Sequence, residues 1–228
     1  DVNDQTPAYS SSDTTPSVNE GTTAVETLSV TDTDTGDTNA CTLGGTDASS
    51  FTCTVSGDSV SLAFSSAPNY ESPGSADSDN DYSVTVTISD GTNTGSTISY
   101  TVSVADTNDQ TPAVTVAATY SQAESSATTF QTYTITDSDT AGTYSCTLGG
   151  TDAADFSTSI SGKVCTVTWA SAPDYDNAAD SGGNNVYDIT LAFSDGTNTL
   201  SAQTTAVTVT DVNDQTPAYS SSDTTPSV

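Results

Sequence analysis

The chain has 228 residues and carries 30 acidic side chains against a single cationic one, with no histidine, for a formal net charge of −29 at pH 7. Nucleic-acid binding needs a basic surface, which is missing here, and Ser-His-Asp or Cys-His catalysis needs a histidine. We therefore expect neither a nucleic-acid-binding protein nor an enzyme.

The sequence repeats itself with a period of 105 residues. DVNDQTPAYSSSDTTPSV at 1–18 returns letter for letter at 211–228, and a near-copy, DTNDQTP, stands at 106–112. Residues 1–105 align with 106–210 without a gap. The repeat predicts domains at 1–105 and 106–210, followed by the linker and first strand of another repeat at 211–228.

Strands are expected throughout each repeat. In the first they fall at about 6–18 (interrupted), 24–31, 39–43, 51–55, 60–64, 82–89 and 94–105, where apolar and small polar residues alternate. Gly57, Gly91 and Gly196 lie in hairpin-turn sequences between such runs. Seven short strands in about 100 residues predict an all-β chain of tandem Greek-key, immunoglobulin-like sandwiches joined end to end.

Four cysteines divide evenly between the two repeats, although their spacing differs. The first repeat has Cys41 and Cys53, and the second has Cys146 and Cys165. An even number per repeat favours a disulfide within each one, whereas thiolate metal sites lack the usual CxxC pairs and histidines. All four fall on inward strand positions, so we expect both disulfides inside a core and an extracellular, oxidising location.

The acids recur at fixed offsets instead of being spread evenly. One group follows the first strand and another the second strand; a third comprises Asn69, Tyr70 and Glu71 with the acids at 77–81; a fourth follows the sixth strand, and further acids lie in the linker at 106–109. Carboxylates crowded in this way repel one another unless a hard cation lies between them. Ca²⁺ suits such all-oxygen sites, whereas softer transition metals do not.

Plainer interpretations stand beside calcium. A disordered acidic chain would not space its aspartates regularly, and halophile-like surface charge would explain the shortage of lysine but not that spacing. Asp32 and Asp34 could be solvated loop acids, and Asp90 could serve only its turn. The acids at 77–81 are expected to be loop charge, and Asp47 and Asp152 turn residues.

Several motifs together resemble cadherin repeats, in their bacterial form, over the whole chain. DVNDQTP resembles the family linker Asp-x-Asn-Asp-x-x-Pro, VNEG resembles its first-strand glutamate motif, and TDTD and TDSD resemble its Asp-x-Asp. The stretch from PNYE to DNDYSVTVTISDG resembles its acidic motif, sixth strand and terminal aspartate. The resemblance implies a cadherin-like sandwich in each repeat and calcium ions clamped between successive domains.

The resemblance also implies three ligand sets. For the junction inside the chain these are Glu20, Asn69, Glu71, Asp106, Asn108, Asp109, Asp137, Asp139 and Asp195. For an upstream junction they are Asp1, Asn3, Asp4, Asp32, Asp34 and Asp90, and for a downstream one Glu124, Asp174, Asp176, Asp211, Asn213 and Asp214. Asn69 stands where the family usually has an acid, and Glu124 falls one position earlier than Glu20 in the ungapped alignment.

The function implied is a calcium-rigidified rod, a stalk or extender of a bacterial surface adhesin. Its partners would be calcium ions and adjacent repeats of the same array, at the cell surface. The alternative is a self-assembling extracellular fibre or sheath with homotypic end-to-end or lateral contacts. No apolar run in this sequence is long enough to cross a bilayer.

Overall fold

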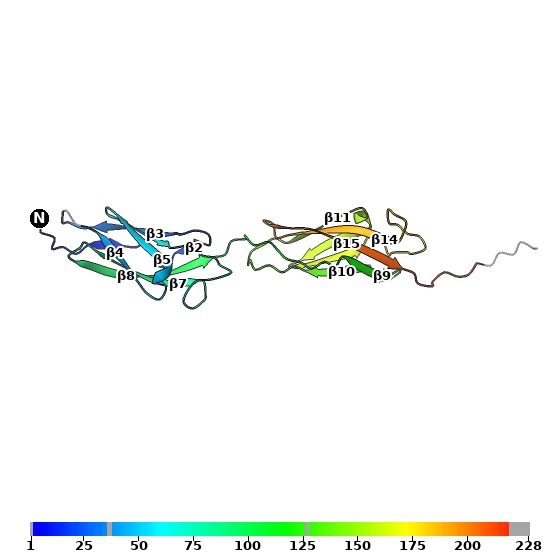
Figure 1. Cartoon of the computed structure of the whole chain (residues 1–228), viewed down its shortest axis with the longest axis horizontal. Coiled ribbons are helices and arrows are strands. Elements are labelled where there is room, and N and C mark those ends of the chain that lie inside the picture. The colour runs from blue at the N-terminus through cyan, green and yellow to red at the C-terminus, as the bar shows by residue number, and fades with distance from the viewer. Residues whose placement is uncertain (1, 36–37, 126–127, 219–228) are drawn as a thin grey trace, which may run out of the picture. The chain divides into compact units, whose positions relative to one another are not determined.

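The computed structural model describes residues 2–35, 38–125 and 128–218. It comprises two compact units, residues 1–109 with 138–141 and residues 110–137 with 142–228 (Figure 1). Both units consist of β-sheets, as expected, and their only helical turns in the described ranges are the short 3₁₀ segments η1 (Ala48–Ser50) and η2 (Ala153–Asp155). The predicted repeat boundary at 105/106 coincides with the end of β8.

Unit 1 contains two four-stranded sheets. One has the order β1 (Ala8–Ser10), β3 (Ala24–Thr31), β6 (Ser59–Phe64), β5 (Phe51–Ser56). The other has the order β2 (Ser17–Asn19), β8 (Thr94–Ala105), β7 (Asp81–Ser89), β4 (Ala40–Gly44). The first predicted strand is indeed interrupted: β1 pairs antiparallel with β3, whereas β2 pairs parallel with β8 in the opposite sheet.

Unit 2 has the same plan with one difference. Its sheets are β10 (Thr129–Thr134), β13 (Val164–Trp169), β12 (Phe156–Ser161) and β11 (Ser145–Gly149), β14 (Val186–Ser194), β15 (Thr199–Thr210), β9 (Thr119–Ala123). Where β1 would pair in this unit, the described residues form a single bridge between Ala113 and Thr136. The parallel pairing of β9 with β15 is correspondingly longer, five residue pairs against three in unit 1.

Alternating burial builds each core. On β7, Tyr82, Val84, Val86 and Ile88 are buried and the residues between them are more exposed. This is the pattern expected where a sheet has one face against a partner sheet. Aromatic rings fill the remaining space, including the Phe156–Trp169 pair with ring centroids 4.1 Å apart in unit 2.

Both predicted disulfides form, Cys41–Cys53 and Cys146–Cys165, with Cα–Cα distances of 6.3 and 6.1 Å. The second is buried as expected. The expectation of a core position for the first was wrong, because Cys41 and Cys53 are only half-buried. The two disulfides differ in topology: Cys41 and Cys53 both lie on edge strands, β4 and β5, whereas Cys146 lies on the edge strand β11 but its partner Cys165 lies on the central strand β13.

Asp47 and Asp152 are turn residues, as predicted, and they also join loops to sheets. Asp47 is buried, and its carboxylate accepts hydrogen bonds from the backbone N–H groups of Ala76 and Ser83, both at 2.7 Å. Asp152 accepts the equivalent bonds in unit 2. A buried carboxylate satisfied by backbone donors is stable without a metal.

Candidate calcium site

The first candidate ligand, Glu20, follows β2 and is buried in unit 1. Its Oε2 accepts a hydrogen bond from the Tyr70 N–H at 2.8 Å, and its Oε1 accepts one from the Thr107 N–H at 2.8 Å. The Thr107 hydroxyl donates to the same Oε1 at 3.1 Å. One carboxylate therefore connects the end of β2, the 68–71 loop and the linker.

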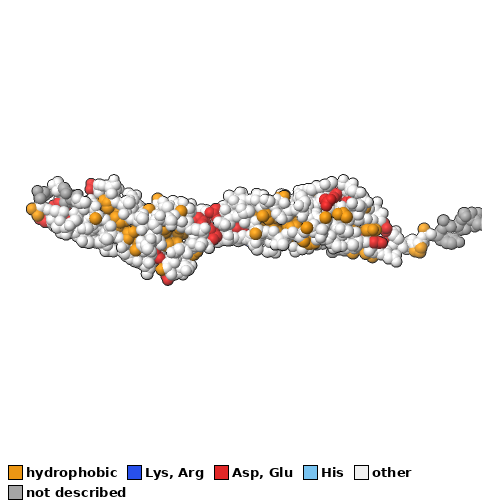
Figure 2. Space-filling model, in the orientation of Figure 1, with side chains coloured by type: hydrophobic (Ala, Val, Ile, Leu, Met, Phe, Trp, Pro, Cys, Tyr) orange, Lys and Arg blue, Asp and Glu red, His pale blue; other side chains and the backbone are white. Residues whose placement is uncertain are grey.

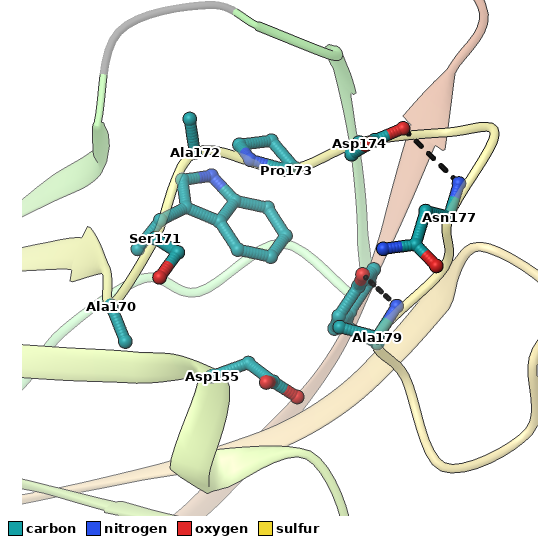
Figure 3. Close-up of a pocket in the computed structure, with 10 residues that line it drawn as sticks. Asp155, Ala170, Ser171, Ala172, Pro173, Asp174, Asn177 and Ala179 are labelled. Carbon is teal, nitrogen blue, oxygen red and sulfur yellow. Dashed lines mark hydrogen bonds between the residues drawn. The ribbon is translucent and has the colours of Figure 1, made fainter.

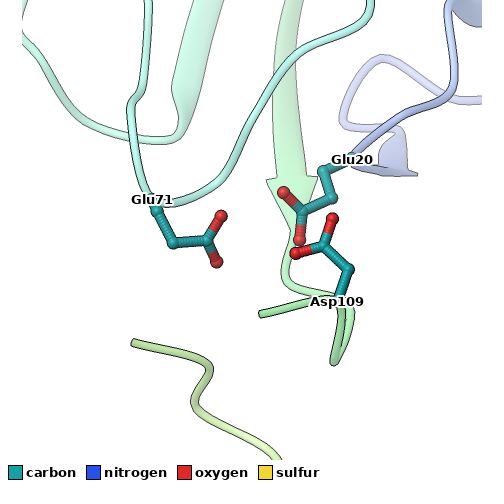
Figure 4. A group of neighbouring side chains, drawn as sticks. All are labelled: Glu20, Glu71 and Asp109. Atoms are coloured by element: carbon teal, nitrogen blue, oxygen red, sulfur yellow. The ribbon is translucent and has the colours of Figure 1, made fainter. Parts of the chain in front are cut away.

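Glu71 and Asp109 bring two further carboxylates to Glu20. One oxygen from each of the three lies within 4.8 Å of the others, and their side chains point toward one another (Figure 4). Glu20 and Glu71 come from unit 1's own strands and loops, while Asp109 comes from the linker. The structure therefore brings these three candidate ligands together.

Glu71 belongs to a second group as well. It comes together with Asp106 and with Asp139, which lies in the segment 138–141 that forms part of unit 1. That segment is fixed to the linker, because the Thr140 N–H donates to Asp106 Oδ2 at 2.6 Å and the Thr140 hydroxyl bonds to the same oxygen. Glu71 is thus the carboxylate that the two groups share.

The electrostatics of these groups favour a cation. Both carboxylate oxygens of Glu71 and the Oδ1 of Asp106 are buried and accept no hydrogen bond from another described residue. Burial raises the pKa of Glu71, and the nearby charges of Glu20, Asp109 and Asp139 raise it further. An uncompensated buried carboxylate is costly, and a hard divalent ion with oxygen ligands would offset that cost.

The remaining residues predicted for this site are placed differently. Asn69 is exposed, and its Oδ1 accepts a hydrogen bond from the Ser72 N–H at 2.8 Å. Asn108 is half-buried in the linker. In unit 2, Asp137 and Asp195 have carboxylate oxygens within 4.8 Å of each other.

The upstream set is organised by hydrogen bonds. Asp34 Oδ2 accepts bonds from the backbone N–H groups of Asp4 and Gln5 at 2.8 and 2.7 Å, and Asp32 accepts one from the Asp34 N–H. Among the residues described, no three of its acids form a group like those around Glu71. Asp1 lies outside the described residues.

Asp90 in the same set closes the β7–β8 turn. Although burial opposes ionisation, its pKa is lowered by the backbone N–H groups of Asn93 and Thr92 and the side-chain amides of Asn93 and Asn3. The turn interpretation of Asp90 is therefore confirmed, and its role as a metal ligand stays a prediction.

The downstream set gathers around Glu124. One oxygen each of Glu124, Asp174 and Asp176 lies within 4.8 Å of the others. The pKa of Asp176 is raised by burial and by the charges of Glu124, Asp211 and Asp214. Asp211, Asn213 and Asp214 are exposed and line a hollow beside Asp176.

Glu124 occupies the place of Glu20 despite its shifted position in the sequence. Its Oε2 accepts a bond from the Tyr175 N–H at 2.6 Å and its Oε1 one from the Val212 N–H at 2.7 Å. Tyr175 and Val212 lie 105 residues after Tyr70 and Thr107, the partners of Glu20. The backbone N–H groups of Val212 and Tyr175 accordingly lower the pKa of Glu124.

The ungapped alignment is therefore wrong over a short stretch. The bridge of Ala113 with Thr136 lies 105 residues after the pairing of Ala8 with Thr31, so the alignment holds there. Beside the last strand, however, the equivalent of Ser17 is Ser121, one residue earlier than the ungapped alignment places it. By Thr128 the 105-residue spacing holds again, because its carbonyl accepts a backbone hydrogen bond equivalent to the one that the Thr23 carbonyl accepts in unit 1.

Asn93 and Asn198 were not predicted, and they fix linker residues that lie next to candidate ligands. Asn93 Nδ2 donates to the Gln5 carbonyl at 2.8 Å and to Asn3 Oδ1 at 3.0 Å, and Asn198 Nδ2 donates to the Gln110 carbonyl at 2.9 Å. Each asparagine thus ties a linker to the last hairpin of a unit. Its signal in the sequence is the DGTNT motif that occurs in both repeats.

A separate pocket in unit 2 lies beside η2. It is lined by Asp155, the 170–174 loop, Asn177 and core residues including Trp169 and Tyr187 (Figure 3). The Tyr187 hydroxyl accepts a hydrogen bond from the Ala179 N–H at 3.1 Å. Burial raises the pKa of Asp155, and the charges of Asp152 and Asp180 add to it.

Solved structures of similar fold are cadherin extracellular domains. Mouse cadherin-23 EC22-24 matches 92% of this chain and 68% of its own length, at 20% identity and a TM-score of 0.67. Human protocadherin-24 EC1-2 matches 90% of this chain and 98% of its own, at 19% identity and a TM-score of 0.66. The fold is that of tandem cadherin domains.

The chain spans only part of some of these structures. It covers 49% of the protocadherin gammaB7 EC3-6 cis-dimer structure, at 21% identity and a TM-score of 0.63. Neither a family model nor a curated protein matches the sequence. A helix able to span a membrane is not found in the described residues.

Proposed function

We propose that this chain is a calcium-binding structural repeat in which bound Ca²⁺ stiffens the linker between successive domains. The observation that carries this proposal is Glu71, whose two buried oxygens accept no bond from another described residue and face two groups of carboxylates. Acidic side chains gather in patches on the face seen in Figure 2, so local cation binding would relieve a concentrated charge.

Glu20, Glu71, Asp106, Asp109 and Asp139 would hold calcium in unit 1, and Asp137 and Asp195 would supply carboxylate ligands in unit 2. Their carboxylates suit the six to eight oxygen ligands that Ca²⁺ takes, with backbone carbonyls completing the set. The bound ion would supply positive charge that neutralises the acids. The protein contributes the positioning: the bonds from Tyr70 and Thr107 fix Glu20, and the bonds from Thr140 fix Asp106.

Chain connectivity explains how such binding would stiffen the array. Asp106 and Asp109 belong to the linker, and Asp139 belongs to a four-residue segment whose chain continues on both sides into unit 2. Holding all three against Glu20 and Glu71 restricts the backbone torsions that would let one repeat swing on the next. Extracellular modules bind calcium at roughly 10⁻⁴–10⁻³ M, so the linker would be stiff outside the cell.

The role we propose for the parent protein is a stalk at the cell surface, of the bacterial adhesin kind that the motifs resemble. The disulfides support an extracellular location, and the similarity to cadherin extracellular domains supports an adhesion-type repeat. The large negative charge would keep neighbouring stalks apart and soluble.

Small-angle X-ray scattering with and without calcium tests the proposal. We expect the distribution of interatomic distances to narrow when calcium replaces chelator. Asp109→Asn should shift that transition to higher calcium, whereas the control Asp77→Asn makes the same charge change at an exposed loop outside the acidic groups. An identical profile in calcium and chelator would refute stiffening, and concentration-dependent filaments would favour the fibre alternative.

A further inference from the structure

Lys163, the single cationic residue of the chain, lies in the turn between β12 and β13. Its Nζ donates a hydrogen bond to the backbone carbonyl of Asp137 at 3.0 Å and lies 5.1 Å from the centroid of the Tyr144 ring. A cation at that distance from an aromatic ring gains a favourable electrostatic contact. The only lysine is thus held at one of the candidate calcium ligands.

Unit 1 has the opposite charge at the same backbone position. The Lys163 carbonyl accepts a hydrogen bond from the Ile135 N–H at 2.7 Å, and the Asp58 carbonyl accepts one from the Val30 N–H at 2.8 Å. Ile135 and Val30 each stand two residues before an Asp-x-Asp motif. The equivalence is therefore fixed by hydrogen bonding as well as by sequence.

In both units this turn, between β5 and β6 or between β12 and β13, also contacts the loop that follows the Asp-x-Asp motif, but through different groups. In unit 1 the neutral Asn39 side chain donates to the Gly57 carbonyl at 3.4 Å. In unit 2 Tyr144 replaces this asparagine, and the contact is made by the Lys163 ammonium. Only unit 2 therefore has a positive charge beside its Asp-x-Asp motif.

We infer that Lys163 is a positioning residue that holds Asp137 and Tyr144 in place without calcium and lowers the calcium affinity of the Asp137 and Asp195 carboxylates. The inference rests on the proposed function. A fixed positive charge near a divalent ion repels it, so the binding free energy of calcium is less favourable than it would be beside an aspartate. The same charge compensates the carboxylates when calcium is scarce.

The size of the effect follows from Coulomb's law. Lys163→Asp changes the side-chain charge by two units; taking a separation of about 10 Å from the divalent ion as a working value in a water-like dielectric, it should tighten calcium binding about sevenfold at 0.01 M salt. Screening reduces this to about threefold at 0.1 M salt. Lys163→Gln, which changes one unit, should show about half of each effect on a logarithmic scale.

Calcium titration by calorimetry, at both salt concentrations, measures the affinity. The charge control is Ala154→Asp, which makes the net charge more negative by one unit, as Lys163→Gln does by removing a positive charge, and lies at an exposed position near the other end of β12. A second readout is hydrogen exchange in chelator. We expect Lys163→Gln to speed exchange of the Thr143 amide, whose bond to the Asp195 carbonyl closes the segment between Asp137 and Tyr144.

The outcomes separate this inference from the proposed function. Calcium binding by the parent chain, with affinity and exchange unchanged in both Lys163 variants, would overturn the role of Lys163 alone. An equal gain in Ala154→Asp would also overturn it, because net charge would then suffice. If the parent chain took up no calcium, the proposed function would fail and the affinity role of Lys163 with it.

Discussion

Replacing Glu71 by glutamine should have opposite effects on the calcium-free and calcium-bound chain. Without calcium, Glu71 lies within 4.8 Å of other carboxylate oxygens in both groups. Two charges at that distance repel by about 0.9 kcal/mol in water and about 3.5 kcal/mol at an effective dielectric of 20. Because the side chains can move apart, we expect Glu71→Gln to stabilise calcium-free unit 1 by about 1–2 kcal/mol.

With calcium the same variant loses a charged ligand. If its affinity falls about tenfold, calcium at 100 times the parent dissociation constant stabilises the parent by about 2.7 kcal/mol and the variant by about 1.4 kcal/mol. The calcium-induced rise in melting temperature should therefore be about halved. In chelator, the variant should melt about 5 °C or more above the parent.

Thermal unfolding in calcium and in chelator measures both effects, with Asp77→Asn as the matched control. Asp77 is exposed and belongs to none of the acidic groups found in the described residues. A lower melting temperature for Glu71→Gln in chelator would mean that the carboxylate is already compensated by protein groups. An undiminished calcium response would mean that Glu71 is not a ligand. Either result refutes the reasoning.

Two further predictions concern the cores. Replacing both cysteines of either disulfide by serine should lower the free energy of unfolding by about 3 kcal/mol through loop entropy. Loss of Cys146–Cys165 should cost about 1 kcal/mol more than loss of Cys41–Cys53, because a serine hydroxyl at position 165 is fully buried. Equal losses of unfolding free energy on calorimetry would contradict this. Asp155→Ser should raise stability at neutral pH, because the pKa of Asp155 is higher in the folded than in the unfolded chain. The parent therefore gains stability as pH falls through the range between these two pKa values. If the melting temperature depended as steeply on pH in the variant as in the parent, from about pH 4 to 7, Asp155 would be excluded as the cause.

Much of the fold could be predicted from local pattern. The strand expected at 82–89 is β7, Asp81–Ser89, and the one expected at 94–105 is β8 with the same bounds. Alternating burial depends only on neighbours along the chain, so the sequence contains it directly. The half-buried Cys53 could not be predicted in this way, because the edge position of β5 depends on the order of strands in the sheet.

The candidate site was predictable in composition but not in detail. The motifs named Glu20, Glu71 and Asp109, and these three come together. The bond from Thr140 to Asp106 and the inclusion of segment 138–141 in unit 1 depend on contacts between residues distant in sequence. The place of Glu124 was hidden by two compensating one-residue changes, which leave an ungapped alignment intact at both ends.

Glu20 and Glu124 show why Glu71 is the better residue for testing metal binding. Each of the two buried glutamates accepts one backbone N–H from a loop and one from a linker. The linker donor is a threonine in one unit and a valine in the other. The interaction therefore needs the glutamate carboxylate and a backbone N–H group, but no particular side chain on the donor residue. Removing the Glu20 side chain would leave two backbone donors unpaired, so the folded state would be less stable with or without calcium. Neither oxygen of Glu71 accepts such a bond from another described residue, so its replacement separates ligand loss from loss of the fold.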